Sequence, residues 1–260
     1  MGRRTESKLN CLLQSWPKGT PATQPWLEEM GISRQLARKY LSSGWVMRFG
    51  RGVFVRPGDQ VDWLGAVHSL QSQLDMKVHV GGLTALFLKG MAHYLQFGAD
   101  TQVFLFGDGR TRLPAWFLNH RWGARIRYHC PTLFANQVES GFTQVQRNDY
   151  AVRLSAPERA ILEVLHLATT NDSLEHATEL VAGLSTLRPG VVQELLEECR
   201  SIKVKRLFLW AAEHSGHSWF ARLSPEALDL GVGKRVLYRG GHLDRTYQIT
   251  VPPTEALEGV

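Results

Sequence analysis

Hydrophobic residues recur at helical spacing in three short segments near the start of the chain, residues 7–15, 24–30 and 34–42. Prolines and glycines separate the first two segments, and a short Gly-Ile-Ser turn separates the last two. Thr23 and Ser33 stand immediately before the second and third segments, where a helix N-cap belongs. The pattern therefore predicts three helices, the last two joined by a tight turn.

The spacing of the hydrophobic residues changes from helical to strand-like after the third predicted helix. Residues 45–49 and 53–55 are rich in aromatic and β-branched side chains, which predicts two strands. Gly-Arg-Gly at 50–52 joins them, and its glycines permit the positive φ angles that a hairpin tip demands. Helices followed by a ribbon in this order predict a winged helix-turn-helix, a DNA-binding module, over residues 1–57.

The third predicted helix divides into an apolar side and a polar side. Leu36, Tyr40 and Leu41 fall on the apolar side, and Ala37 is small enough to pack closely. Long polar side chains, spaced four residues apart in two rows, line the other side. A recognition helix needs this division, because its domain holds one face while the other presents donors to base edges.

The polar side chains of the helix and ribbon suit DNA. Arg pairs with guanine and Gln with adenine, and each good bidentate contact is worth ~1–3 kcal/mol of discrimination. A cation at a ribbon tip suits phosphates or the adjoining minor groove. The alternative interpretation of the helix is a solvated basic face. The residues that we expect to contact DNA are Ser33, Arg34, Gln35, Arg38 and Lys39 in the helix and Arg48 and Arg51 in the ribbon.

Net charge is concentrated in the same segment. Residues 1–57 contain 10 Lys/Arg against 3 Asp/Glu, a net of +7, whereas residues 58–260 contain 20 against 21, a net of −1. The net charge of +6 is therefore an N-terminal property. A localised excess of cations indicates a polyanionic partner, which supports nucleic-acid binding by this segment.

The remainder of the chain predicts a larger domain, residues 58–260, of mixed α/β structure with a helical C-terminal part. The fold class is therefore α+β, with the winged helix first. The predicted helices span about 60–75, 83–91, 157–167, 173–183, 189–200 and 203–214. The predicted strands span about 78–80, 101–106, 115–118, 124–130 and 149–154, with short strands again within 234–251. Ser155-Ala156-Pro157-Glu158 has the spacing of a capping box at the start of one helix.

Three features of this larger domain are candidates for chemistry. Gly81-Gly82, between a strand and a helix, favours tight backbone packing, with anion binding as the alternative. Arg121, Arg125 and Arg127 give one predicted strand a basic edge, a candidate second nucleic-acid surface or else a solvated face.

Carboxylates are the third feature, because an acidic pair can hold the Mg²⁺ of a nuclease. Asp100 and Asp108 flank a strand, and Glu158 and Glu163 share a helix. Asp108 is interpreted more simply as part of a hairpin turn in Gly-Asp-Gly-Arg.

Other catalytic and metal-binding patterns are missing from the sequence. The histidines are scattered, no HExxH or GxSxG motif occurs, and the cysteines have no partners at metal-ligand spacing. We expect no catalytic site, no metal and no cofactor, and therefore no enzyme. No apolar run approaches the roughly 18 residues that span a bilayer, and the N-terminus lacks a secretory apolar core. We expect a cytoplasmic protein without a membrane partner.

The N-terminal stretch resembles AbiEi-type antitoxins of bacterial abortive-infection, type IV toxin–antitoxin systems. The resemblance is close over residues 7–95 and extends to the remainder only in layout. The segments that carry it are Trp26-Leu27-Glu28, Gly31 through Tyr40, Ser43-Gly44-Trp45, Gly50-Arg51-Gly52 and His79 through Leu86.

The resemblance implies a function for each part of the chain. In that family the winged helix binds inverted repeats in the promoter of its own operon and represses it. The C-terminal domain supplies antitoxin activity against a nucleotidyltransferase-like toxin. The resemblance implies recognition-helix contacts from Arg34, Gln35, Arg38 and Lys39, and a wing contact from Arg51. The double-stranded DNA of its own promoter and the cognate toxin are the expected partners.

Two other functions remain open at the level of sequence. A one-component transcriptional regulator would use the C-terminal domain to sense a small ligand. A Mg²⁺-dependent nuclease would use the carboxylates described above. The charge distribution and the family-like segments favour the DNA-binding antitoxin.

Overall fold

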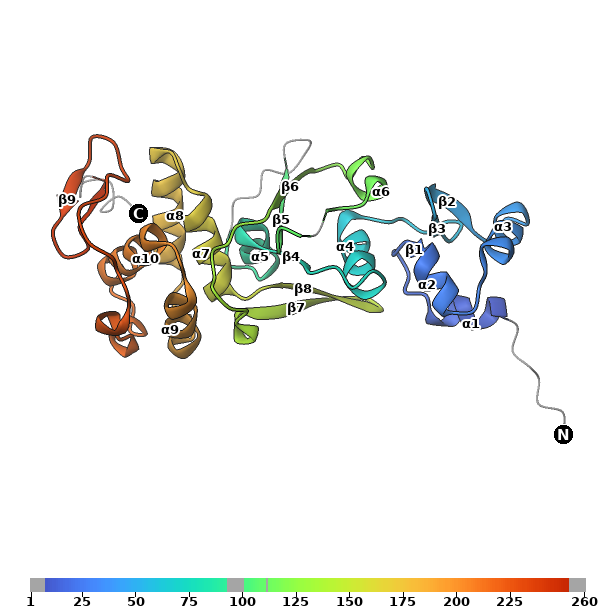
Figure 1. The fold of residues 1–260 in the computed structure, drawn as a ribbon, viewed down its shortest axis with the longest axis horizontal. Coiled ribbons are helices and arrows are strands. Elements are labelled where there is room, and N and C mark those ends of the chain that lie inside the picture. The colour runs from blue at the N-terminus through green and yellow to red at the C-terminus, as the bar shows by residue number, and fades with distance from the viewer. Residues whose placement is uncertain (1–7, 93–100, 111, 253–260) are drawn as a thin grey trace. The chain divides into compact units, whose positions relative to one another are not determined.

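The computed structural model describes residues 8–92, 101–110 and 112–252, and these fall into two compact units (Figure 1). The first unit takes the described residues up to 79, from 101 to 130 and from 144 to 153. The second unit takes those from 80 to 92, from 131 to 143 and from 154 onward. The predicted α+β class, with a winged helix at the N-terminus, is confirmed. The predicted boundary between residues 57 and 58 stays a prediction.

The winged helix forms the start of the first unit. Its elements are α1 (Lys8–Ser15), β1 (Ala22–Thr23), α2 (Gln24–Glu29), α3 (Arg34–Ser42), β2 (Met47–Gly50) and β3 (Val53–Val55). The strands form an antiparallel sheet of order β1-β3-β2, in which β2 is an edge strand. The sequence pattern missed β1, because only its pairing with β3 makes these two residues a strand.

Local signals set the helix ends in this module. The Ser33 hydroxyl accepts a hydrogen bond from the Leu36 amide at 3.3 Å and caps α3 as predicted. Gly31 and Gly44 follow α2 and α3 with φ of +75° and +77°, the left-handed conformation that ends a helix. Thr23 stands at the N-cap of α2, but its hydroxyl makes no capping bond. Its backbone is instead extended and paired in β1.

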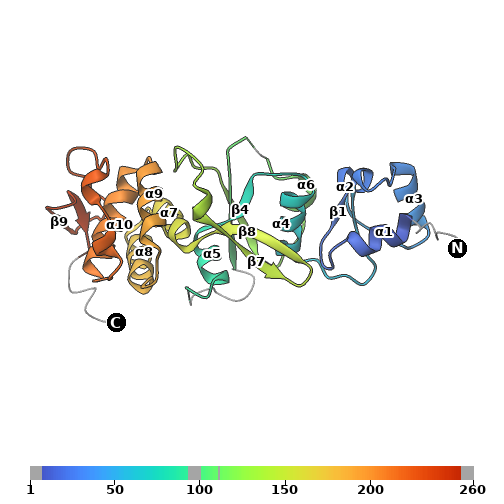
Figure 2. The same cartoon turned by 90° about the horizontal axis from the view of Figure 1, so that it is seen from below.

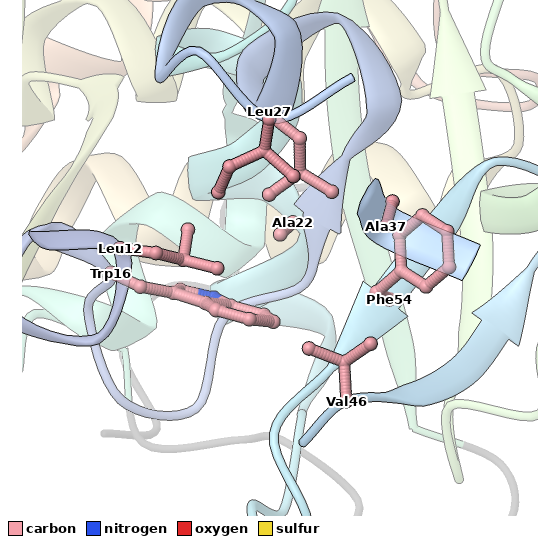
Figure 3. Packing of buried hydrophobic residues seen from close by; sticks show 8 residues of the cluster. Leu12, Trp16, Ala22, Leu27, Ala37, Val46 and Phe54 are labelled. Atoms are coloured by element: carbon pink, nitrogen blue, oxygen red, sulfur yellow. The ribbon is translucent and has the colours of Figure 1, made fainter. Parts of the chain in front are cut away.

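A small apolar core holds the three helices against the ribbon (Figure 3). The side chains that Figure 3 labels come from all three helices, from β1 and β3 and from the connecting segments, and are at most 7% exposed. The Trp16 ring lies among them and donates its indole N–H to the Thr20 carbonyl at 2.8 Å, so its polar atom is satisfied. The labelled residues are Leu12, Trp16, Ala22, Leu27, Ala37, Val46 and Phe54.

A five-stranded sheet of order β6-β5-β4-β8-β7 follows in the chain. Its strands are β4 (Val78–Val80), β5 (Gln102–Gly107), β6 (Arg125–His129), β7 (Phe142–Arg147) and β8 (Tyr150–Ser155). Strands β5 and β6 are parallel, as are β4 and β8. Helix α4 (Trp63–Ser72) ties the sheet to the winged helix, since its Ser69 hydroxyl donates to the Pro21 carbonyl at 2.6 Å and its Gln71 side chain donates to the Arg153 carbonyl of β8 at 3.0 Å.

Three predictions in this region are wrong. Residues 115–118, predicted as a strand, form the helix α6 (Ala115–Leu118), because so short an apolar run does not distinguish the two periods. Asp108 is not in a hairpin, because the strands before and after it are parallel and need a crossover. Its carboxylate accepts a hydrogen bond from the Arg110 amide at 3.0 Å, which makes a local turn.

The third wrong prediction is the capping box at the start of α7 (Pro157–Leu167). The N-cap is Ala156, which has no side chain to donate or accept. The Ser155 hydroxyl donates instead to Glu163, and Glu158 binds Arg188. A capping box does occur one helix later, between Thr170 and Ser173.

The second unit is mostly helical, and its helices α7 to α10 lie together in both views (Figures 1 and 2). Residues 204–212 of α10 are all buried, as expected of a helix surrounded by protein. The other elements of this unit are α5 (Gly82–Leu88), η1 (Glu139–Gly141), α8 (Asn171–Gly183), α9 (Pro189–Glu198), α10 (Ile202–His214), η2 (Phe220–Arg222), η3 (Pro225–Ala227), β9 (His242–Asp244) and β10 (Ile249–Val251).

Candidate nucleic-acid interface

Helix α3 has the two faces that the sequence predicts. Ala37 is 1% exposed, and Leu36, Tyr40 and Leu41 pack against the core of the module. The opposite face consists of exposed polar side chains, which are Ser33, Arg34, Gln35, Arg38 and Lys39. These five side chains are therefore accessible to a partner along one face of the helix.

Arg34 is partly engaged by the protein itself. Its Nε donates to Glu28 Oε1 of α2 at 3.1 Å, and the two side chains are 77% and 45% exposed. An ion pair so open to solvent is worth little, roughly 0–1 kcal/mol. Arg38 and Lys39 form no ion pair with any residue that the structure describes. Helix α3 thus presents two unpaired cations and a third, Arg34, that a stronger anion can recruit.

The ribbon places Arg48 in β2 and Arg51 at the tip, and both are exposed. Gly52 has φ of +70°, so the tip uses glycine where a side chain would be strained. The Gly52 carbonyl accepts a hydrogen bond from the Gln24 amide at 2.8 Å, which ties the returning strand to the start of α2. Within the described residues neither arginine makes an ion pair.

The wing also contacts a segment that the sequence gives no reason to connect with it. Phe49 of β2 stacks on His120, with ring centroids 4.4 Å apart and planes 26° from parallel. Trp116 of α6 and Trp122 lie about the same ring at 6.1 Å and 6.0 Å. Sequence reasoning missed this cluster, because aromatic residues so far apart in the chain carry no shared pattern.

The candidate second basic surface is divided in the structure. Arg125 and Arg127 are exposed on one face of β6, alternating with half-buried Ile126 and Tyr128, as predicted. Arg127 Nε donates to Gln102 Oε1 on the neighbouring strand at 3.0 Å. Arg121 lies outside β6, between the two residues His120 and Trp122 that pack on the wing.

The anion at the Gly81-Gly82 turn is a side chain of the protein itself. The Gly82 amide, at the start of α5, donates to Glu163 Oε2 at 2.9 Å. Glu163 is 1% exposed and also accepts from the Ser155 hydroxyl and from Arg159 Nε at 2.9 Å. A carboxylate from α7 therefore occupies this helix N-terminus.

Two of the carboxylates considered for Mg²⁺, Glu158 and Glu163, are engaged in structural ion pairs. Arg188 donates to Glu158 through its backbone amide and through two guanidinium nitrogens, at 2.9 to 3.0 Å. Burial acts to raise the pKa of Glu158, and these bonds hold it below its ordinary value. Asp100 lies outside the described residues. Among the residues described, no cluster of three or more His, Cys, Asp or Glu side chains is placed to hold a metal ion.

A polar cavity of about 410 Å³ lies in the first unit, lined by Lys18, Asp59, Asp62, Arg147 and Tyr150 among others. Its acidic groups already have partners, since Asp62 pairs with Arg147 at 3.6 Å and Asp59 with Arg56 at 3.1 Å. No helix in the described part of the chain is long and apolar enough to cross a membrane.

The fold is similar to that of a solved structure. The crystal structure of the RV2827C protein from Mycobacterium tuberculosis superposes with a TM-score of 0.54 over 96% of this chain and 92% of that chain, at 15% sequence identity. At this identity the likeness establishes the fold alone. No curated protein matches the chain.

Two family models match adjoining parts of the sequence. Residues 5–97 match the N-terminal domain of the AbiEi antitoxin transcriptional regulator, and this segment includes the whole winged helix. Residues 100–252 match the model described as transcriptional regulator, AbiEi antitoxin, type IV TA system. The resemblance seen in the N-terminal segments is thereby confirmed and extended past residue 100. This chain belongs to the AbiEi antitoxin family, the transcriptional regulators of type IV toxin–antitoxin systems.

Proposed function

We propose that this protein represses its own toxin–antitoxin operon by binding inverted repeats in the promoter through α3 and the wing. The observation that carries the proposal is the set of exposed cations on one small module, Arg38 and Lys39 on α3 and Arg48 and Arg51 on the ribbon. Helix α3 supplies the base contacts, and the ribbon contacts the phosphates or the minor groove beside them.

An electrophoretic shift with the double-stranded DNA upstream of its own gene tests this half of the function. We expect salt-sensitive binding, with a slope of log K against log[salt] near −0.9 for each phosphate neutralised. Arg34→Ala combined with Arg38→Ala should abolish the sequence preference. Lys234→Ala combined with Arg235→Ala removes the same charge from exposed positions of the second unit and is the matched control. Equal loss in both double variants, or no binding by the wild type, contradicts the repressor function.

We further propose that the C-terminal part, residues 58–260, neutralises a cognate nucleotidyltransferase-like toxin without being an enzyme itself. Membership of the antitoxin family supports the antitoxin activity. Glu158 and Glu163 form ion pairs within the chain, which supports a structural role for these carboxylates. The toxin is expected to be encoded beside this gene.

Co-expression separates neutralisation from repression. The toxin, expressed from an unrelated promoter, should arrest growth, and the Arg34→Ala/Arg38→Ala variant should restore growth as well as the wild type does. If the wild type does not restore growth, the proposed antitoxin activity is contradicted. Failure of the variant alone would show that DNA binding and neutralisation use the same residues.

A further inference from the structure

We propose that residues 115–122, outside the winged helix, clamp the wing in its DNA-binding position and add Arg121 to the DNA interface. The inference rests on the proposed repressor function and concerns the same DNA partner. It states that the interface includes residues from the region matched by the second family model. We name Ala115–Trp122 the wing clamp.

The contact between the wing and the clamp is an aromatic cluster. The ring centroids of Phe49 and His120 are 4.4 Å apart, and those of His120 and Trp122 are 4.3 Å apart. The His120 ring therefore contacts both the wing ring and the indole of Trp122. Phe117 anchors the cluster, because it is fully buried and its carbonyl accepts a hydrogen bond from Trp122 Nε1 at 2.8 Å. The buried Phe117 therefore fixes the clamp within the first unit, and the bond from Trp122 holds the two parts of the clamp together.

Gly50 shows how close the approach is. A Cβ atom at this position would lie 2.7 Å from Trp116 Cβ, a separation at which one of the two segments must move. The φ angle of Gly50 is not in the left-handed region, so backbone conformation does not require glycine there. The small size of residue 50 is required by the contact with α6.

The wing needs such support. Its strands span four and three residues, β2 is an edge strand, and the pairing is irregular between Arg48 and Gly50. The third strand, β1, adds only two residues on the far side of β3, and a hairpin of this size is marginal by itself. A wing correctly placed in only a tenth of molecules would bind with an apparent Kd about tenfold higher, so a clamp that fixes its position increases affinity.

Arg121 lies where the clamp would bring a cation to the same DNA. The residues on either side of it, His120 and Trp122, both pack on Phe49 of the wing. Arg121 is exposed and forms no ion pair with any described residue. Burial lowers the pKa of His120, so at neutral pH the positive charge of this segment belongs to Arg121. The guanidinium is free to neutralise a phosphate beside the wing.

The test compares full-length variants by titration of the upstream DNA at several salt concentrations. Arg121→Ala should reduce the salt slope by about 1 and weaken binding evenly across DNA sequences. Gly50→Ala should weaken binding by about tenfold through displacement of the wing. Gly190→Ala is the matched control, because nothing lies within 4 Å of a Cβ at that glycine. An unchanged slope for Arg121→Ala, or equal affinities for the two glycine variants, overturns the inference.

A double-mutant cycle guards against simple misfolding. Phe49→Ala and His120→Ala should each weaken DNA binding, and the double variant should be no weaker than the worse single variant. Additive effects would mean that the two rings act independently, which contradicts a clamp. Each variant is first shown by circular dichroism to melt as a folded protein.

The outcomes distinguish this inference from the repressor function. If DNA binding is lost in Arg34→Ala/Arg38→Ala but unchanged in the clamp variants, the repressor function is supported and the clamp is contradicted. If the wild type does not prefer the upstream DNA, the repressor function fails, and the same variants are titrated on a random-sequence duplex. There an unchanged salt slope for Arg121→Ala also overturns the clamp.

Discussion

The winged helix and the second unit use arginine in opposite ways. In the winged helix Arg38, Arg48 and Arg51 extend into solvent, and Arg34 has only a loose, exposed partner. In the second unit Arg159 binds a carboxylate that is 1% exposed, and Arg206 donates to four backbone carbonyls while itself 3% exposed. The difference shows that a count of charges does not measure the cations available to a partner. The positive charge of α3 and the ribbon is accessible, whereas Arg56, which pairs with Asp59 at the end of the module, and Arg159 and Arg206 in the second unit support the fold.

The largest effect should come from breaking a pair in the second unit. Glu163→Gln leaves Arg159 without its carboxylate while the guanidinium stays between Phe134 and Phe142, each ring 4.4 Å from its carbon. Removing one member of a buried pair costs about 3–5 kcal/mol. Thermal unfolding should show this loss, and the exposed Glu226→Gln should not. A variant as stable as the wild type would mean that Arg159 does not depend on Glu163.

An intermediate effect should come from α3, and it should alter selectivity as well as affinity. Arg38→Ala should cost about 1–3 kcal/mol on the preferred sequence and relax the preference at one base pair, if Arg38 contacts a base. Lys39→Ala should weaken binding similarly on all sequences. Competition titrations against a random-sequence duplex check this, and the same pattern in both variants would contradict separate roles.

A smaller effect of opposite sign should follow from Glu28→Gln. This change releases Arg34 from an exposed ion pair worth about 0.2–1 kcal/mol and removes a negative charge beside α3. DNA affinity should therefore rise by about 1.5- to 5-fold, in contrast to every arginine variant. Fluorescence anisotropy at moderate salt measures it. Glu29→Gln, one residue further along, is the matched control, and weaker binding by Glu28→Gln would show that the pair helps to place Arg34.

The smallest effect concerns the pH dependence of stability, which a partly buried histidine controls and the arginines do not. Burial lowers the pKa of His68 despite its hydrogen bond to the Ala151 carbonyl at 2.9 Å. A depressed folded-state pKa means that its stability contribution is present above pH of about 6.5 and is lost as pH falls through the folded pKa. The melting temperature should fall less on acidification in His68→Gln than in the wild type. If the melting temperatures of the two proteins fall equally with pH, His68 is not the cause of the acid destabilisation.

The sequence predicted the elements whose ends are set locally. The bounds of α3 were predicted to the residue, because Ser33 and Gly44 carry their capping roles within the segment. Elements that depend on distant partners were missed or misassigned. Strand β1 exists only through pairing with β3, and the supposed capping box at Ser155 failed because its side chains bind Glu163 and Arg188 instead.

The candidate interface shows the same limit. The exposed and buried faces of α3 follow from its helical period, so their side chains were assigned correctly from the sequence. Phe49 and His120 share no pattern, and only the fold places them together. The DNA contacts themselves remain predictions until they are measured.

The guanidinium of Arg206 also ties α10 to a segment far along the chain. Its four carbonyl partners belong to Leu230, Gly231, Gly233 and Gln248, so the hydrogen bonds reach almost to β10. Arginine keeps its charge at any accessible pH. A nonsense mutation or proteolytic cut before residue 248 would therefore leave a charged side chain partly unsatisfied inside α10. Chains that end before residue 248 should therefore be less stable than the full chain, because Arg206 loses one of its four carbonyl partners.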